Sequence, residues 1–259
     1  MQVYDTIIFM KGRKLKMIFG KGDSKTGTKP ILKPEDAVQM KFAQRIQREV
    51  AREFIHFNVE INPDDFSVYT VTTIYLHSTI QLLSRMYNDK DDIELNLDDI
   101  FIIKPSTSVD EYADKTGNIN CKILLGPKGE EIIKNIEKYE SVPDYNEVID
   151  IPIPEDEIER RQLEELEISV CKELLSYELA FKPQDFICHL CAITYMKRAL
   201  VEACTFAKRF PDELILVNTH NMIEIEAIFE SETEEIFVNV HPGVEYKLKI
   251  KSDFHTEDE

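Results

Sequence analysis

The sequence of 259 residues lacks the features of a membrane protein or of a disulfide-rich secreted protein. No stretch approaches the roughly 18 consecutive apolar residues that a membrane-spanning helix requires. Residues 1–16 hold a short apolar run without a preceding basic region or a small-residue cleavage site, so no signal peptide is expected. The five cysteines are odd in number and scattered, unlike a disulfide framework. We therefore expect a protein of a reducing aqueous compartment, the cytoplasm, with no membrane partner.

Recognisable catalytic and cofactor-binding motifs are also missing. The six histidines have no mutual spacing of three or four residues, and the chain contains no G-x-S-x-G or H-E-x-x-H pattern and no Walker A loop. The acidic run 89–99 lacks the central glycine and the alternating aspartates of a calcium loop. The sequence thus predicts a non-catalytic protein without metal or cofactor. An enzyme whose site assembles only in three dimensions is a third alternative, because catalytic triads follow geometry rather than sequence order.

The stretch that most resembles a chemical site is "FICHLCAITYMKRALVEAC", residues 186–204. Zinc needs about four converging ligands, and Cys188 and Cys191 supply only two. At 100° per residue, Cys204 falls on nearly the opposite side of a helix from Cys191. A redox CxxC begins a helix directly after a strand, whereas this pair follows another predicted helix. We therefore predict that the pair belongs to the buried face of a helix.

Charge is distributed very unevenly along the chain. The formal net charge is −18, yet the segment 11–33 carries eight basic residues against the single acid Asp23, so it is +7 and the remaining residues sum to −25. The basic residues of this segment are Lys11, Arg13, Lys14, Lys16, Lys21, Lys25, Lys29 and Lys33. Such a basic segment can dock on phosphates or on the acidic body of a neighbouring copy. A solvated hairpin and loop is the simpler alternative.

Hydrophobic periodicity predicts an α+β fold. In the N-terminal region, 1–152, a β-hairpin within the basic arm 1–33 precedes long helices, and the proline-rich stretch 141–154 is a candidate linker or crossing strand. In the C-terminal region, 153–259, a helical hairpin packs on a four-stranded antiparallel meander. The elements expected along the chain are strands 3–9 and 15–19, helices 34–57 and 66–88, strands 100–103 and 121–125, a turn and helix at 126–140, helices 155–180 and 183–210, and strands 213–218, 222–229, 235–241 and 244–250.

The loop in "ILLGPKGEEIIKNI", residues 123–136, resembles the GxxG loop of KH domains. The resemblance implies that Gly126 and Gly129 would expose backbone amides to a nucleic-acid backbone and that Lys128 would contact a phosphate. Two features depart from the KH pattern: the residues before the loop are strand-like rather than helical, and Glu130 and Glu131 follow it directly. A strand–turn–helix connection with glycine at its corners accounts for the same residues.

Two functions follow as hypotheses. The first is a non-catalytic structural or assembly protein that acts through contacts with copies of itself or with other subunits, because charge segregation suits head-to-tail oligomers. The composition, rich in Lys, Ile, Asp and Glu and without tryptophan, suits a virion component of a tailed bacteriophage such as a connector or neck ring. The alternative is a nucleic-acid-binding protein that uses the GPKG loop and the basic arm.

Overall fold

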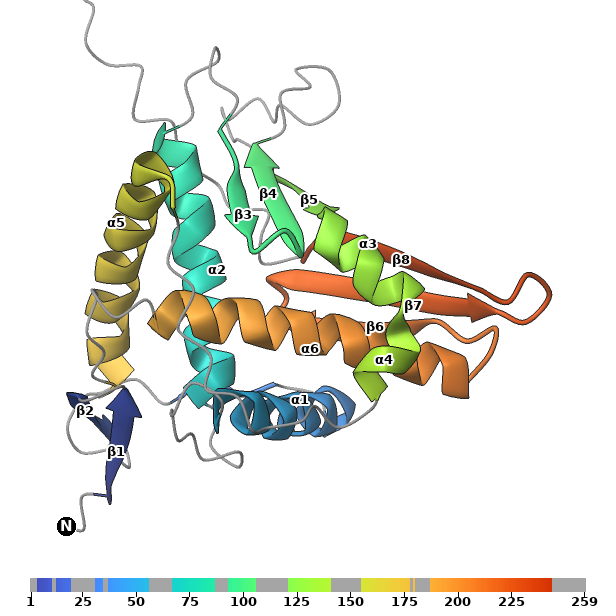
Figure 1. Cartoon of the computed structure of the whole chain (residues 1–259), viewed down its shortest axis with the longest axis horizontal. Coiled ribbons are helices and arrows are strands. Elements are labelled where there is room, and N and C mark those ends of the chain that lie inside the picture. Colours follow the sequence, from blue (N-terminus) through green and yellow to red (C-terminus); the bar gives the residue numbers. More distant parts are fainter. Residues whose placement is uncertain are drawn as a thin grey trace, which may run out of the picture.

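The structure is a computed structural model that describes residues 4–10, 13–19, 31–34, 37–55, 67–86, 93–105, 121–140, 155–177, 179 and 187–243. Within these residues it is an α+β fold of six α-helices, one β-hairpin and two three-stranded antiparallel sheets (Figure 1). The helices are α1 (Ala37–Ile55), α2 (Ser67–Met86), α3 (Pro127–Lys134), α4 (Ile136–Glu140), α5 (Glu157–Leu174) and α6 (Ile187–Arg209). The strands are β1 (Tyr4–Met10), β2 (Arg13–Phe19), β3 (Leu95–Leu97), β4 (Phe101–Pro105), β5 (Cys121–Leu125), β6 (Ile215–Thr219), β7 (Ile223–Glu230) and β8 (Glu235–Pro242).

Helix α6 is the centre of the molecule. It contacts the five other helices and all three strands of the C-terminal sheet, and every residue from Ile187 to Met196 is buried. A helix that is buried all round needs partners on every side. Tyr195 of α6 meets Tyr69 of α2 edge to face, with ring centroids 5.9 Å apart. Side chains of both predicted regions, 1–152 and 153–259, therefore join one contiguous cluster of buried residues around this helix.

The C-terminal sheet packs one face on α6. Its strand order is β6-β7-β8, and Ile223, Ile225 and Ala227 of the central strand are fully buried while the residues between them are only half-buried. This alternation has the period of two expected for a sheet with one covered face. The β6 edge is covered in turn by α1, since the Gln39 side chain donates to Leu216 O (2.9 Å) and accepts from Asn218 N (3.0 Å).

The second sheet, β3-β4-β5, packs against α2, and its outer strand β5 lies beside β8 of the C-terminal sheet. A tight turn at Asp98 and Asp99, both with positive φ, joins β3 to β4. His220 and Asn221 form the corresponding turn between β6 and β7. In each of these three-residue connections two consecutive residues have positive φ, a conformation that Asn, Asp and His tolerate better than most other residues.

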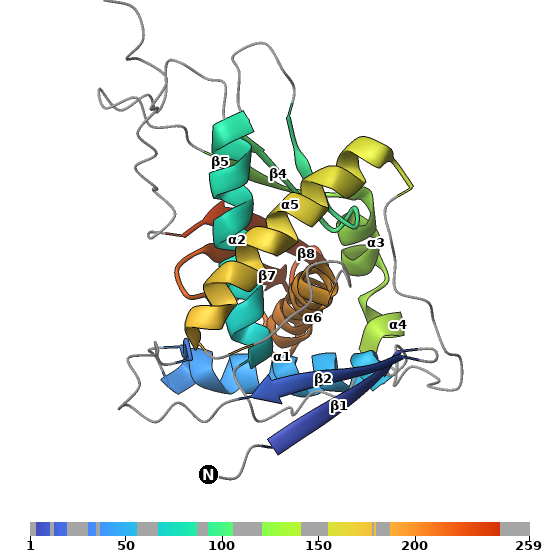
Figure 2. The same ribbon diagram turned by 90° about the vertical axis from the view of Figure 1, so that its left-hand side faces the viewer.

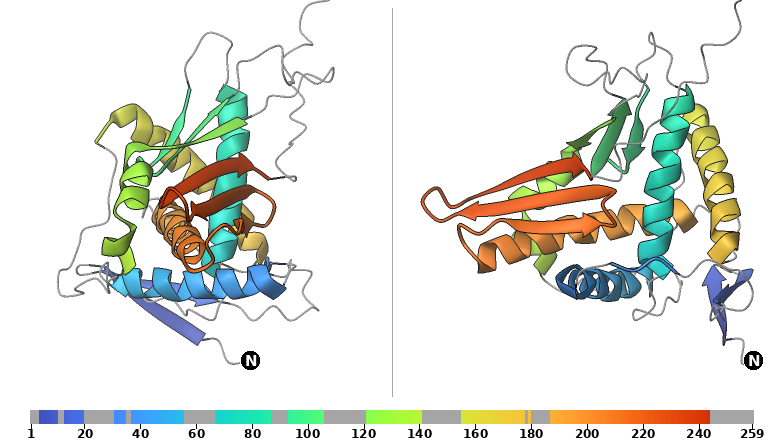
Figure 3. Two further views of the ribbon diagram at one scale, coloured as in Figure 1. Left: turned by 90° about the vertical axis from the view of Figure 1, so that its right-hand side faces the viewer. Right: turned by 180° about the vertical axis from the view of Figure 1, so that it is seen from behind.

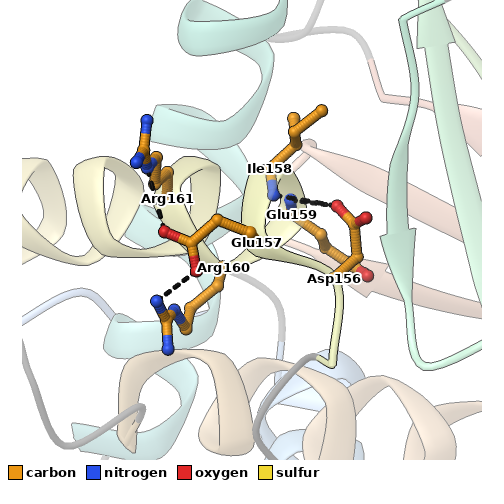
Figure 4. A network of polar contacts seen from close by, with 6 residues as sticks. All are labelled: Asp156, Glu157, Ile158, Glu159, Arg160 and Arg161. Carbon is orange, nitrogen blue, oxygen red and sulfur yellow. Dashed lines mark hydrogen bonds and ion pairs between the residues drawn. The ribbon is translucent and has the colours of Figure 1, made fainter.

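Helix α5 packs obliquely across α2 rather than on a sheet (Figure 2). Its N-terminus is fixed by Asp156, whose carboxylate accepts from Ile158 N and Glu159 N, each at 2.9 Å (Figure 4). Glu157 in the first turn pairs with Arg160 and with Arg161. These contacts satisfy helix-terminal amides and place negative charge at the positive end of the helix dipole.

Two ion-pair groups join α1 to α6. Glu53 of α1 pairs with Lys197 at 2.7 Å and with Arg198 at 2.8 Å. Burial alone would raise the pKa of Glu53, but the two cations lower it below its usual value. Arg45 pairs with Glu202 at 2.6 Å one turn further along α6. The ion pairs thus hold α1 across α6 at a fixed register.

The structure confirms the predicted α+β class and corrects its details. The C-terminal sheet has three strands within the described residues, and the predicted fourth strand, 244–250, lies outside them. Only one helix of the predicted helical hairpin covers that sheet, because the buried face of α5 packs mainly on α2. In α1 the apolar residues spaced four apart are buried at Ile46, Val50 and Phe54, but Val38 at the start of the same series is 60% exposed.

Two further sequence expectations concern a linker and membrane-spanning helices. The candidate linker, 141–154, lies outside the described residues. Within the part of the chain that the structure describes, none of the helices is both long and apolar enough to span a membrane.

Candidate interaction surface

The CxxC pair lies in the core, as predicted. Cys188 and Cys191 are each 1% exposed, and the Cys188 sulfur lies 4.0 Å from that of Cys171 on α5. Contact with Cys171 and burial raise the pKa of Cys188, and burial also raises the pKa of Cys191. A thiol that stays protonated is a poor nucleophile and a poor metal ligand. These sulfurs therefore serve as packing groups where α5 meets α6.

A buried polar contact, which the sequence did not reveal, lies beside the cysteines. The Tyr75 hydroxyl of α2 is 2.7 Å from His189 Nδ1, and the His189 backbone amide donates to the buried carboxylate of Glu167 at 3.2 Å. Burial lowers the pKa of His189 to about 4, against a weaker opposing effect of Asp98. The ring is thus neutral at pH 7 and can accept a hydrogen bond from the tyrosine hydroxyl. The three residues join α2, α5 and α6, and each of them is at most 7% exposed.

Among the residues that the structure describes, no three His, Cys, Asp or Glu side chains converge as metal ligands would. A groove of about 560 Å³ does lie between α3–α4, the end of α6 and the β7–β8 turn. Its polar lining consists of Asn135, three lysines and four glutamates, with Lys208 and Glu137 3.6 Å apart. The groove therefore offers ionic contacts of both signs.

The GPKG residues form a strand–turn–helix corner. Strand β5 precedes the loop, and α3 begins at Pro127. The amides of Lys128 and Gly129 donate to the carbonyl oxygen of Asp99, at 3.0 and 3.3 Å, and the Gly126 amide donates to Ile100 O at 2.9 Å. The amides that would hold a phosphate in a KH-type loop are therefore already engaged.

Close backbone packing accounts for both glycines of this corner. A Cβ atom at Gly126 would lie 2.1 Å from Asp99 O, and one at Gly129 would lie 2.5 Å from Ile100 O. Lys128, half exposed, pairs with Asp98 at 2.7 Å across the same corner. The loop thus fixes α3 against the β3–β4 turn.

The basic segment is described only in part. Arg13, Lys14 and Lys16 lie on β2, and Lys33 is exposed just before α1. The other four predicted contact residues, Lys11, Lys21, Lys25 and Lys29, lie outside the described residues. The extensive contacts of β1 and β2 within the described chain are with each other.

A surface of strongly one-sided charge is the acidic sheet face, defined as the side of β6-β7-β8 that points away from α6. Residues 210–243 contain no lysine and no arginine but eight acids. These acids are Asp212, Glu213, Glu224, Glu226, Glu230, Glu232, Glu234 and Glu235. In the described part of the chain, the His241 imidazole lies 3.1 Å from a carboxylate of this face, that of Glu226. The signal that could have revealed the face was the absence of basic residues over 34 positions.

Comparison with known proteins adds no relative: no protein-family model, curated protein or solved structure matches this chain.

Proposed function

We propose that this chain is a non-catalytic structural protein that assembles with copies of itself, or with other subunits, through electrostatically complementary surfaces. The observation that carries the proposal is that one polypeptide has both a +7 segment, 11–33, and a sheet whose described strands, β6, β7 and β8, contain no lysine or arginine. Opposite charges concentrated on separate parts of a chain favour heterologous contacts, which close into rings or extend as filaments.

The N-terminal hairpin supports a role for a partner. A two-stranded hairpin is marginally stable by itself in water, because it buries too little apolar surface. Strands β1 and β2 pair over seven residues each and make their extensive contacts with one another. A surface supplied by another subunit would cover one face of this two-stranded sheet and so stabilise it. A ring in a tailed-phage virion, such as a connector or neck, is the specific assembly that the composition suits.

Nucleic acid is the second candidate partner. The charge of the basic segment favours it, since lysines that neutralise phosphates release counterions on binding. The engaged amides of Lys128 and Gly129 confine this alternative to the basic segment, and the −25 charge of the remaining residues opposes it.

Light scattering coupled to size-exclusion chromatography tests the proposal. The full chain is expected to elute as an oligomer at 50 mM salt and to dissociate toward monomers at 500 mM salt, because surface charges are screened over a few ångströms at that ionic strength. The proposal would be contradicted by a chain that stays monomeric at every concentration up to the millimolar range and that also binds no other subunit when mixed with its native extract. Fluorescence anisotropy with single- and double-stranded oligonucleotides at 50 mM salt tests the alternative, which fails if no binding is seen.

A further inference from the structure

We propose that the acidic sheet face is the surface on which the basic segment, 11–33, of a second copy docks. The inference rests on the proposed function, because it names the surface through which the copies would meet.

The register of the strands sets out the residues of this face in rows. Asn218, Glu224 and His241 form one row across the sheet, and Leu216, Glu226 and Asn239 form the next. Ile228 and Phe237 follow as an apolar pair, and Glu230 and Glu235 come last. Carboxylates therefore lie on both sides of an apolar row.

The apolar row and the residue beside it are more exposed to solvent than side chains of the core. Phe237 is 43% exposed, and Leu214, just before β6, is 60% exposed. Seen from behind, the sheet lies in front of α6, and no helix of the described chain is drawn over it (Figure 3, right). An exposed aromatic residue rimmed by charge is typical of an interaction surface.

The carboxylate rows and the apolar row of this face would match a partner segment in which basic residues alternate with apolar residues at short intervals. The segment Arg13–Phe19, "RKLKMIF", places two lysines and an arginine among Leu15, Met17, Ile18 and Phe19. Its positive charges match the carboxylate rows, and its apolar residues match the row of Ile228 and Phe237. Nucleic acid is excluded from this face by the like charge of its phosphates.

The arrangement favours docking on a second copy rather than on the same chain. Strands β1 and β2 lie at one end of the molecule, near the C-terminal end of α5, while the β7–β8 hairpin projects from the other end (Figures 1 and 3). Contacts between the basic end of one copy and the acidic end of the next are head-to-tail, and they repeat until a ring closes.

Charge reversal on the full chain tests this surface. The double variant E224K/E226K is expected to weaken self-association at 50 mM salt by about tenfold or more, because two attractive contacts become repulsive. The matched control is E164K/E165K, which makes the same charge change on the exposed face of α5 and is expected to change association by less than about threefold. Adding K14E/K16E to E224K/E226K is expected to restore association.

Photo-cross-linking gives a second measurement that does not depend on charge. With p-benzoylphenylalanine in place of Phe237, irradiation is expected to produce a species of twice the chain mass, cross-linked within residues 11–33. Equal association of the wild-type chain, the sheet variant and the control, or a cross-link mapped elsewhere, would overturn the surface but leave the proposed function standing. A wild-type chain that never associates would instead overturn the proposed function.

Discussion

Protonation of the buried His189 is expected to limit the stability of the protein in mild acid. The His189 imidazole lies 2.7 Å from the Tyr75 hydroxyl, the backbone amide of His189 donates to the Glu167 carboxylate, and the residue is 7% exposed. A charged ring at this position would lose its hydration without gaining an ion-pair partner of comparable strength. The folded protein therefore binds this proton less readily than the unfolded chain does.

The size of the effect follows from the two pKa values. The pKa of His189 is about 4 in the folded protein, lowered from 6.5, its ordinary value. Because the unfolded chain takes up the proton first, the free energy of unfolding falls as the pH falls from about 6.5 to 4. At about 1.4 kcal/mol for each pH unit between those values, the total loss from this residue is about 3 kcal/mol.

The variant His189→Gln isolates this contribution. Glutamine cannot titrate but still offers an oxygen to the Tyr75 hydroxyl. Because the two chains have the same carboxylates, the contributions of those carboxylates cancel when the two pH profiles are compared. Urea unfolding followed by circular dichroism at pH 7.5, 6.5, 5.5 and 4.5 gives the free energy of unfolding of each chain. The wild type is expected to lose about 2–3 kcal/mol more than the variant over that range. Parallel pH profiles for the two chains would refute the reasoning.

Three further substitutions test the packing of the fold by chemical denaturation. Gly126→Ala is expected to cost about 3 kcal/mol, because its Cβ would press on the Asp99 carbonyl and break the cap of α3, whereas Lys128→Ala costs under about 1 kcal/mol; equal effects would contradict the packing role. Glu53→Ala leaves two cations of α6 without their shared carboxylate and is expected to cost about 3 kcal/mol, against under about 1 kcal/mol for Glu49→Ala on the same helix. Asp156→Ala removes the cap of α5 and is expected to cost about 1 kcal/mol, with no change if the cap is unimportant.

Hydrophobic periodicity predicted the regular elements well where one face is buried and the other is exposed to solvent. The β7 alternation of Ile and Glu fixed both its strand character and its inward face, and the predicted strand 121–125 coincides with β5. The sequence could not show which layers pack together. The leucines of α5 suit a sheet or another helix equally well, and only the position of α2 decides between them. Strand β3 was missed because its three residues lie inside an acidic run that resembles a loop.

The candidate site was harder to predict because its signals are relations between distant residues. The contact between Tyr75 and His189 joins residues 114 positions apart, and neither residue belongs to a motif. The role of Gly126 depends on the Asp99 carbonyl, a backbone atom that carries no sequence signature. Charge segregation, in contrast, is a property of composition along the chain. The sequence therefore revealed the basic segment, although the absence of basic residues over 210–243 was not recognised.

The two faces of the C-terminal sheet can serve packing and the proposed docking separately. Alternate residues of β7 point in opposite directions, so Ile223, Ile225 and Ala227 can be committed to α6 without constraining the residues between them. The strand register places the glutamates between them in rows across the sheet. A backbone already ordered by the inner face need not be ordered again when a partner binds, which would favour specific docking over diffuse attraction. Destabilising the inner face should therefore weaken association even where no outward charge has changed.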